Sequence, residues 1–314
     1  MKIALLFSGQ IRNLPVDIFQ KSLSNLTREI DYEIYSYSWY ETGKSLNHSK
    51  HPTQIDNLNN APKLVKELFK NFNLKVAKFE SFLEFEKNLL PGYKKIYKSE
   101  RFHSGTVNSM PQIYALSKCF KLVSENLNNF DLIFKCRFDS MYVHPLKVYN
   151  LERIKYSNKL YNINFGRSFY PKRVYDIFFG GSVKSMFFLN TIWEELPNLV
   201  NDEFNNNLDK MDACRLFYLG AYKQKINVVS FETRICDIFR NFKNNYYEKY
   251  LISMHLIRLK NCLINIESIR YFLNWFRYRK MRYSRIIFLI IISFFITPFS
   301  YLKRFKFIKY FNIF

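Results

Sequence analysis

Two side chains of opposite charge, Arg137 and Asp139, stand two residues apart shortly after a short apolar run at 132–134. The run is too short for a helix and is rich in β-forming residues, so it predicts a buried strand. Side chains two residues apart on an extended chain lie on the same face. Ligands of open α/β sheets bind just outside the carboxyl ends of the parallel strands. The spacing therefore predicts a charged binding site at the end of this strand, with an ion pair that binds no ligand as the alternative.

A second polar group follows the first apolar run of the chain, at 2–7, which also predicts a buried parallel strand. Ser8, Gly9 and Arg12 come directly after this run. Glycine permits close approach of the backbone to a ligand, and Arg12 can meet a phosphate or a uracil-type base. The stretch lacks the second and third glycines of a dinucleotide-binding fingerprint, so an ordinary strand-to-helix turn is the alternative.

Three motifs in this order resemble those of GT-A-type bacterial glycosyltransferases of lipopolysaccharide and capsule synthesis, in particular the WavE-like enzymes. They are Ser-Gly-Gln-x-Arg at 8–12, Arg-x-Asp at 137–139, and an acid, an aromatic pair and Gly-Ser within 176–182. The resemblance implies an α/β, GT-A-like (Rossmann-like) fold with a mixed, mostly parallel sheet flanked by helices. It implies an enzyme that transfers a sugar from a nucleotide-sugar to a surface-polysaccharide or lipid-linked glycan acceptor.

The resemblance also implies which residues meet the nucleotide-sugar. Ser8, Gly9 and Arg12 are expected at the nucleotide. Gln112 precedes the Arg-x-Asp strand by one helix, which implies a contact to the sugar donor, with a solvated residue in the first turn of that helix as the alternative. Arg137 replaces the first acid of the family's Asp-x-Asp element. An arginine can offset diphosphate charge directly through bidentate hydrogen bonds.

Asp139 is the acid that remains of that element, and it is expected to act in catalysis and to hold Mn²⁺ or Mg²⁺ if a metal is used. Because the first acid is replaced, metal dependence is left open. Asp176 heads the acceptor-side motif, and we predict it as the base if the reaction inverts. Gly180 and Gly181 are expected to let a sugar ring approach the backbone, with a plain strand-to-helix turn as the alternative.

Alternating strands and helices are predicted around these residues, as in an α/β sheet. Further strands are expected at 32–39, 74–79 and 226–231, and helices at 16–26, 109–127, 183–196 and 211–222. Ser109 is expected to cap its helix with Pro111 in the first turn, and Asp212 to cap the last helix. The acidic, Asn-rich stretch 201–207 is expected to be a loop.

The charge of the chain is uneven. The net charge is +22, and residues 251–314 hold twelve Lys and Arg against one acid, Glu267. Within this segment, 286–302 is free of charged residues and has cations on both sides. This run is at the lower limit for a membrane span, and Pro298 interrupts it. An interfacial or re-entrant anchor on an anionic membrane surface is therefore expected.

These patterns predict a glycosyltransferase domain at 1–245 and a basic, apolar, membrane-associating segment at 246–314. The five cysteines are widely scattered without metal-ligand spacing, which indicates reduced core residues of a cytoplasmic protein attached to or anchored in the inner or plasma membrane. A nucleic-acid-binding protein and a non-catalytic membrane-associated protein are the alternatives. No nucleic-acid partner is expected, because the basic residues concentrate beside a long apolar run.

Overall fold

The computed structural model describes residues 1–11, 16–42, 60–97, 106–142, 144–163, 172–206, 212–231 and 236–238. All of these lie in the first of two compact units, Met1–Phe239, and the second unit is Arg240–Phe314. The predicted membrane-associating segment at 246–314 lies outside the described residues, so it and the division near residue 245 stay predictions. Among the helices that are described, none is long and apolar enough to cross a membrane.

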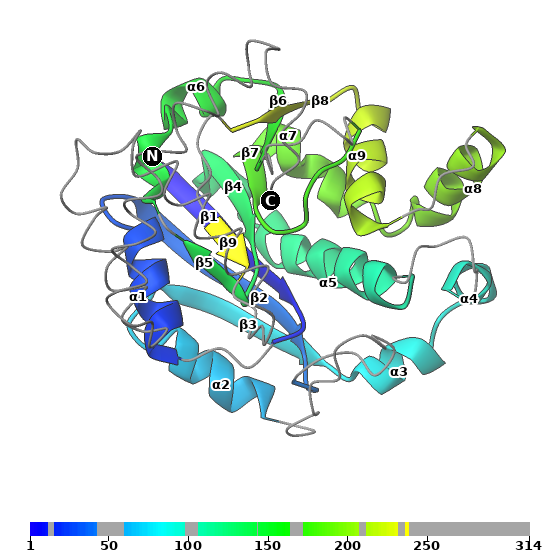
Figure 1. Ribbon diagram of the computed structural model, residues 1–314, viewed down its shortest axis with the longest axis horizontal. Helices are drawn as coiled ribbons and strands as arrows, with labels where there is room; N and C mark the ends of the chain where they lie inside the picture. Colours follow the sequence, from blue (N-terminus) through cyan, green and yellow to red (C-terminus); the bar gives the residue numbers. More distant parts are fainter. Residues whose placement is uncertain are drawn as a thin grey trace, which may run out of the picture. The chain divides into compact units, whose positions relative to one another are not determined.

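A seven-stranded sheet forms the centre of the first unit (Figure 1). In spatial order its strands are β3 (Leu74–Glu80), β2 (Asp31–Trp39), β1 (Lys2–Gly9), β4 (Leu132–Cys136), β7 (Phe179–Ser182), β6 (Lys159–Asn162) and β8 (Asn227–Ser230). All neighbours pair in parallel except β7, which is antiparallel to both β4 and β6. The predicted mixed, mostly parallel sheet is therefore confirmed. A separate antiparallel pair joins β5 (Ser140–Tyr142) to β9 (Cys236–Ile238).

Helices cover both faces of the sheet, which is why its central strands are mostly apolar. Along β1, Ile3 and Phe7 belong to the core under α1 and α2, whereas Ala4 and Leu6 belong to the core under α5 and α9. The longer helices are α1 (Val16–Leu26), α2 (Ala61–Leu68), α5 (Thr106–Ser124), α8 (Leu196–Asn206) and α9 (Ala213–Lys223). The shorter ones are α3 (Phe82–Lys87), α4 (Pro91–Tyr97), α6 (Leu151–Lys155), α7 (Val183–Met186), and the 3₁₀ turns η1 (Leu127–Asn129), η2 (Leu146–Val148) and η3 (Phe187–Asn190).

The order in which strands are added to the sheet reverses at β1. Strands β2 and β3 lie on one side of β1, and β4 lies on the other. β1 and β4 are in register up to Phe7 and Cys136, so Gly9 and Arg137 follow at neighbouring strand ends. Ligands in open α/β sheets bind beyond the carboxyl ends of the strands at such a reversal. The fold thus brings the two predicted polar groups to one edge of the sheet.

Helix α5 begins at Thr106, earlier than the sequence predicts. Pro111 therefore stands inside the helix, where its ring removes one backbone hydrogen bond. Ser109 does not cap α5, because its hydroxyl accepts a hydrogen bond from the N–H of Ala213 at 3.0 Å. The first N–H groups of a helix have no partner within it, so Ser109 satisfies one of these groups for α9.

The single helix predicted at 183–196 is wrong, because the segment divides into α7, η3 and a turn. Its fully buried residues Met186, Leu189 and Ile192 recur every three positions, which matches the 3₁₀ period better than the α period. The predicted loop at 201–207 is also wrong, since α8 extends to Asn206. The predicted helix at 16–26 and strands at 32–39, 74–79 and 226–231 are confirmed to within a residue or two.

Candidate active site

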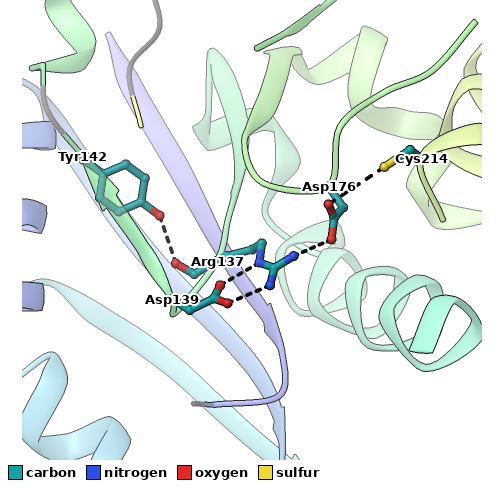
Figure 2. A network of polar contacts seen from close by, with 5 residues as sticks. All are labelled: Arg137, Asp139, Tyr142, Asp176 and Cys214. Carbon is teal, nitrogen blue, oxygen red and sulfur yellow. Dashed lines mark hydrogen bonds and ion pairs between the residues drawn. The ribbon is translucent and has the colours of Figure 1, made fainter. Parts of the chain in front are cut away.

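One guanidinium and two carboxylates form a charged cluster beyond the carboxyl end of β4 (Figure 2). Arg137 donates from Nε and Nη2 to the two carboxylate oxygens of Asp139, both at 2.7 Å. Its Nη1 donates to Oδ2 of Asp176 at 2.6 Å. The side chains of Arg137, Asp139 and Asp176 are exposed by 12%, 4% and 17%. The fold thus brings Asp176, 39 residues away in the chain, to the pair at the strand end.

The turn after β4 holds the backbone of this cluster in place. The carbonyl of Arg137 accepts hydrogen bonds from the N–H of Ser140 at 3.4 Å and from the hydroxyl of Tyr142 at 3.2 Å. Tyr142 is itself fully buried, and its N–H donates to the hydroxyl of Ser22 on α1 at 2.5 Å. The cluster is therefore anchored to the helix layer beneath β5 as well as to the sheet.

The guanidinium of Arg137 stays charged in this setting. Burial by itself lowers the pKa of Arg137, but the nearby carboxylates of Asp139 and Asp176 outweigh burial and raise the pKa above its ordinary value. A guanidinium has five N–H groups, and three of them are used here. The other two, one on each terminal nitrogen, have no partner among the residues that the structure describes.

A lysine that the sequence analysis did not single out lies beneath the cluster. Lys135 on β4 is only 4% exposed. Its register partners, Leu6 on β1 and Phe179 on β7, are fully buried apolar residues. Burial lowers the pKa of Lys135 to about 8, although the charges of Asp176 and Asp139 oppose the shift. The sequence feature that could have pointed to Lys135 is a charged residue within an otherwise apolar strand.

The start of α9 borders the cluster on the side of Asp176. The thiol of Cys214 donates toward Oδ1 of Asp176 at 3.9 Å. Burial raises the pKa of this thiol, so the thiol stays protonated and can donate. Asp212 accepts a hydrogen bond from the N–H of Arg215 at 2.9 Å and forms an ion pair with Arg173. The predicted cap at Asp212 is therefore confirmed.

The end of β1 borders the site on the other side. Gly9 has a φ of +100°, a conformation that side chains rarely adopt. Among the described residues, no atom lies within 4 Å of the position that a Cβ at Gly9 would take, so they leave this side of the backbone uncovered. The carbonyl of Gly9 accepts a hydrogen bond from Ser38 at 2.9 Å, which ties β1 to the end of β2.

Three further residues are predicted to contact the nucleotide or the sugar donor. Ser8 is buried at the end of β1. Gln112 is half-buried on α5, so its contact to a sugar donor stays a prediction. Arg12 lies outside the described residues.

Gly180 and Gly181 are explained by packing within the sheet. A Cβ at Gly180 would lie 2.2 Å from Cδ1 of Phe134, and one at Gly181 would lie 2.3 Å from Oγ of Ser185. The expectation that these glycines let a sugar ring approach is therefore wrong, because protein atoms already fill the space beside them.

The surroundings of Asp139 do not form a cation site in this arrangement. Both of its oxygens accept hydrogen bonds from Arg137. Mn²⁺ and Mg²⁺ are held by several oxygen ligands, whereas a guanidinium stands where the first acid of Asp-x-Asp would be. Over the described part of the chain, no group of three or more His, Cys, Asp or Glu could hold a metal ion. The residues that are present do not fit the predicted metal.

Comparisons with known proteins find similarity in structure alone. No protein-family model and no curated protein matches the chain. Mouse xyloside xylosyltransferase 1, in its apo form, matches with 12% identity and a TM-score of 0.42 over 74% of this chain and 85% of that chain. The galactosyltransferase LgtC, in complex with donor and acceptor sugar analogues, matches with 10% identity and a TM-score of 0.38 over 73% of each chain. At these values the similarity assigns neither an activity nor a substrate to the chain.

Proposed function

We propose that the chain is a GT-A-type glycosyltransferase that transfers a sugar from a nucleotide-sugar to a surface-polysaccharide or lipid-linked glycan, at the cytoplasmic face of a membrane. The observation that carries the proposal is the charged cluster of Arg137, Asp139 and Asp176 at the strand-order reversal. A ligand-binding site is expected at that place. The motifs at 8–12, 137–139 and 176–182 add support through their resemblance to the WavE-like enzymes.

Arg137 is the group that would meet the diphosphate of the sugar donor. Its two remaining N–H groups can bind phosphate oxygens, while Asp139 fixes the plane of the guanidinium from the other edge. When the bond between the sugar and the diphosphate breaks, negative charge builds on the leaving oxygen. A cation already in position stabilises that charge in the transition state without reorganising.

Asp176 is the group that would serve the acceptor. Its carboxylate is paired with Arg137, which favours the ionised form that a base requires. In an inverting reaction the acceptor hydroxyl oxygen attacks the anomeric carbon. The hydroxyl proton passes to Asp176, and the bond to the diphosphate breaks to release the nucleoside diphosphate.

The proposal is tested with a panel of nucleotide-sugars. Thermal unfolding of the full chain is measured with each compound, once with Mn²⁺ and once with EDTA, and hydrolysis or transfer is followed for any compound that stabilises the protein. One nucleotide-sugar is expected to raise the unfolding temperature and to be consumed. If none stabilises the protein or is consumed under either condition, the assignment is wrong and a non-catalytic protein remains.

A further inference from the structure

Lys135 is a buried cation with no protein partner in the described part of the chain. It is 4% exposed, and no hydrogen bond or ion pair joins it to another described residue. A lysine with so little exposed surface loses most of its hydration, and lysine is almost never buried in this way without a reason. A methionine would fill much the same volume without that cost. Packing alone therefore does not explain a lysine at this position of β4.

The charge of the neighbouring cluster gives Lys135 a role. Arg137 is bonded to two carboxylates, so the cluster by itself carries one net negative charge. Counted alone, these three residues would repel the diphosphate of a nucleotide-sugar. With the ammonium of Lys135 included, two cations face two anions and the repulsion is removed. The charges of Asp176, Arg137 and Asp139 all act on Lys135, which shows that the four groups share one electrostatic environment.

We infer that Lys135 is a positioning residue that balances the charge of Arg137, Asp139 and Asp176, so that an anionic diphosphate can approach Arg137. The inference rests on the proposed function and adds to it a residue outside its three motifs. Lys135 acts through the cluster and from inside the sheet. The guanidinium remains the group that contacts the ligand.

Inorganic pyrophosphate is the probe, because it carries the diphosphate charge without a base or a sugar. Its dissociation constant is measured by calorimetry in EDTA at physiological salt for the wild-type full chain, Lys135→Met and Lys155→Met. Lys155 is the matched control, because it pairs with Asp131 beside the amino end of the same strand. Both variants remove one positive charge, but only Lys135→Met removes it next to the cluster.

Lys135→Met is expected to weaken pyrophosphate binding about tenfold or more, as the loss of one shielded charge should. Its unfolding temperature should be no lower than that of the wild type, since the cost of burying the charge disappears. Lys155→Met should bind pyrophosphate as the wild type does. Weaker binding by a variant that unfolds at the wild-type temperature separates a role in binding from a role in stability.

The pH dependence of pyrophosphate affinity is a measurement that would not change if Lys135 served only in packing. The charges of Asp176, Arg137, Asp139 and Cys136 act on Lys135. At the start of α9, Cys214 contacts Asp176 and Asp212 pairs with Arg173. Among them Lys135, whose pKa is about 8, is expected to lose its charge in mildly alkaline solution. The affinity of the wild type relative to Lys135→Met should therefore fall as the pH rises through about 8.

The outcomes distinguish this inference from the proposed function. If the wild type binds pyrophosphate or a nucleotide-sugar and Lys135→Met binds equally well, the inference is wrong and the proposed function stands. If the two dissociation constants keep the same ratio across the pH series, the inference is also wrong. If the wild type binds neither pyrophosphate nor any nucleotide-sugar, both are overturned together.

Discussion

Asp139 uses both carboxylate oxygens to hold one edge of the guanidinium of Arg137, and Asp176 accepts one N–H group of Nη1. Replacing Asp139 by Asn puts an amide donor against a guanidinium donor and removes a charge. We expect Asp139→Asn to abolish sugar transfer while the fold remains, at a cost of about 1–3 kcal/mol in the free energy of unfolding for one buried partner lost. Turnover and circular dichroism of the same sample measure both effects.

Asp131→Asn is the control for this change, because Asp131 lies before the amino end of β4 and pairs with Lys155 at 2.7 Å. It should keep wild-type turnover. Normal turnover in Asp139→Asn would remove Asp139 from the site.

If Asp176 is the base, replacing it should slow the chemical step without weakening the binding of the nucleotide-sugar. We expect Asp176→Asn to lower turnover by roughly 10²–10⁴, the usual effect of losing a general base. Affinity for the nucleotide-sugar should not fall, because the bidentate contact of Arg137 to Asp139 remains and the cluster loses one negative charge. Single-turnover kinetics and a separate binding titration measure the two quantities. An equal loss in both would place Asp176 on the nucleotide side of the site.

At the scale of elements, two glycines on the strands that flank β4 have different roles. A Cβ at Gly180 in β7 would meet Cδ1 of Phe134 at 2.2 Å and the carbonyl of Ile133 at 2.4 Å. We expect Gly180→Ala to lower the free energy of unfolding by about 3 kcal/mol or more through overpacking. A Cβ at Gly9 would meet no atom of the described residues. Gly9→Ala should therefore lower the free energy of unfolding by only about 1–2 kcal/mol, because of the positive φ at this position.

Gly92→Ala in α4 is the matched control for these two changes, since it also meets no atom within 4 Å. It should change stability by no more than about 0.5 kcal/mol. Chemical denaturation of the three variants gives the order. A Gly180→Ala protein as stable as Gly92→Ala would contradict the packing of β4 against β7.

The elements themselves could be predicted wherever one hydrophobic period dominates. The apolar runs of β1 and β4 and the regular stripe of α1 are of this kind. The segment after β7 was not predictable in this way, because its buried residues follow a three-residue period that reads as an irregular α-helix. The start of α5 was placed too late, because Pro111 usually marks a first turn.

The candidate site was predictable in part for a similar reason. Arg137 and Asp139 are close in sequence, so the strand period alone puts them together. Their contact to Asp176 depends on an antiparallel strand, β7, whose pairing with β4 leaves no local signal. Cys214 reaches Asp176 through a helix further still along the chain. Charge compensation by Lys135 depends on burial, which only the assembled sheet supplies.

For the whole molecule, the predicted tail makes membrane attachment separable from sugar-donor binding. The full chain should sediment with anionic vesicles and resist a high-salt wash, because apolar burial of 286–302 adds to the attraction of its flanking cations. A chain ending at Asn245 should stay in solution and still bind the nucleotide-sugar, since the charged cluster lies within Met1–Phe239. Sedimentation and thermal shift measure the two properties.

Aggregation of the shortened chain would contradict this prediction. If the chain ending at Asn245 aggregates and cannot be refolded, the segment at 246–314 belongs to the folded core. Neutral vesicles are the control for the electrostatic part of the attraction.

The pairing of β1 with β4 also governs how the chain must be made. The N–H of Lys2 bonds to Asp131, 129 residues further along. As the chain emerges from the ribosome, β2 can join one edge of β1 early, but the other edge waits until β4 has been synthesised. An apolar strand with an open edge is a template for association with other chains. Yield of active protein is therefore expected to depend on chaperone supply during synthesis more than on the stability of the finished fold.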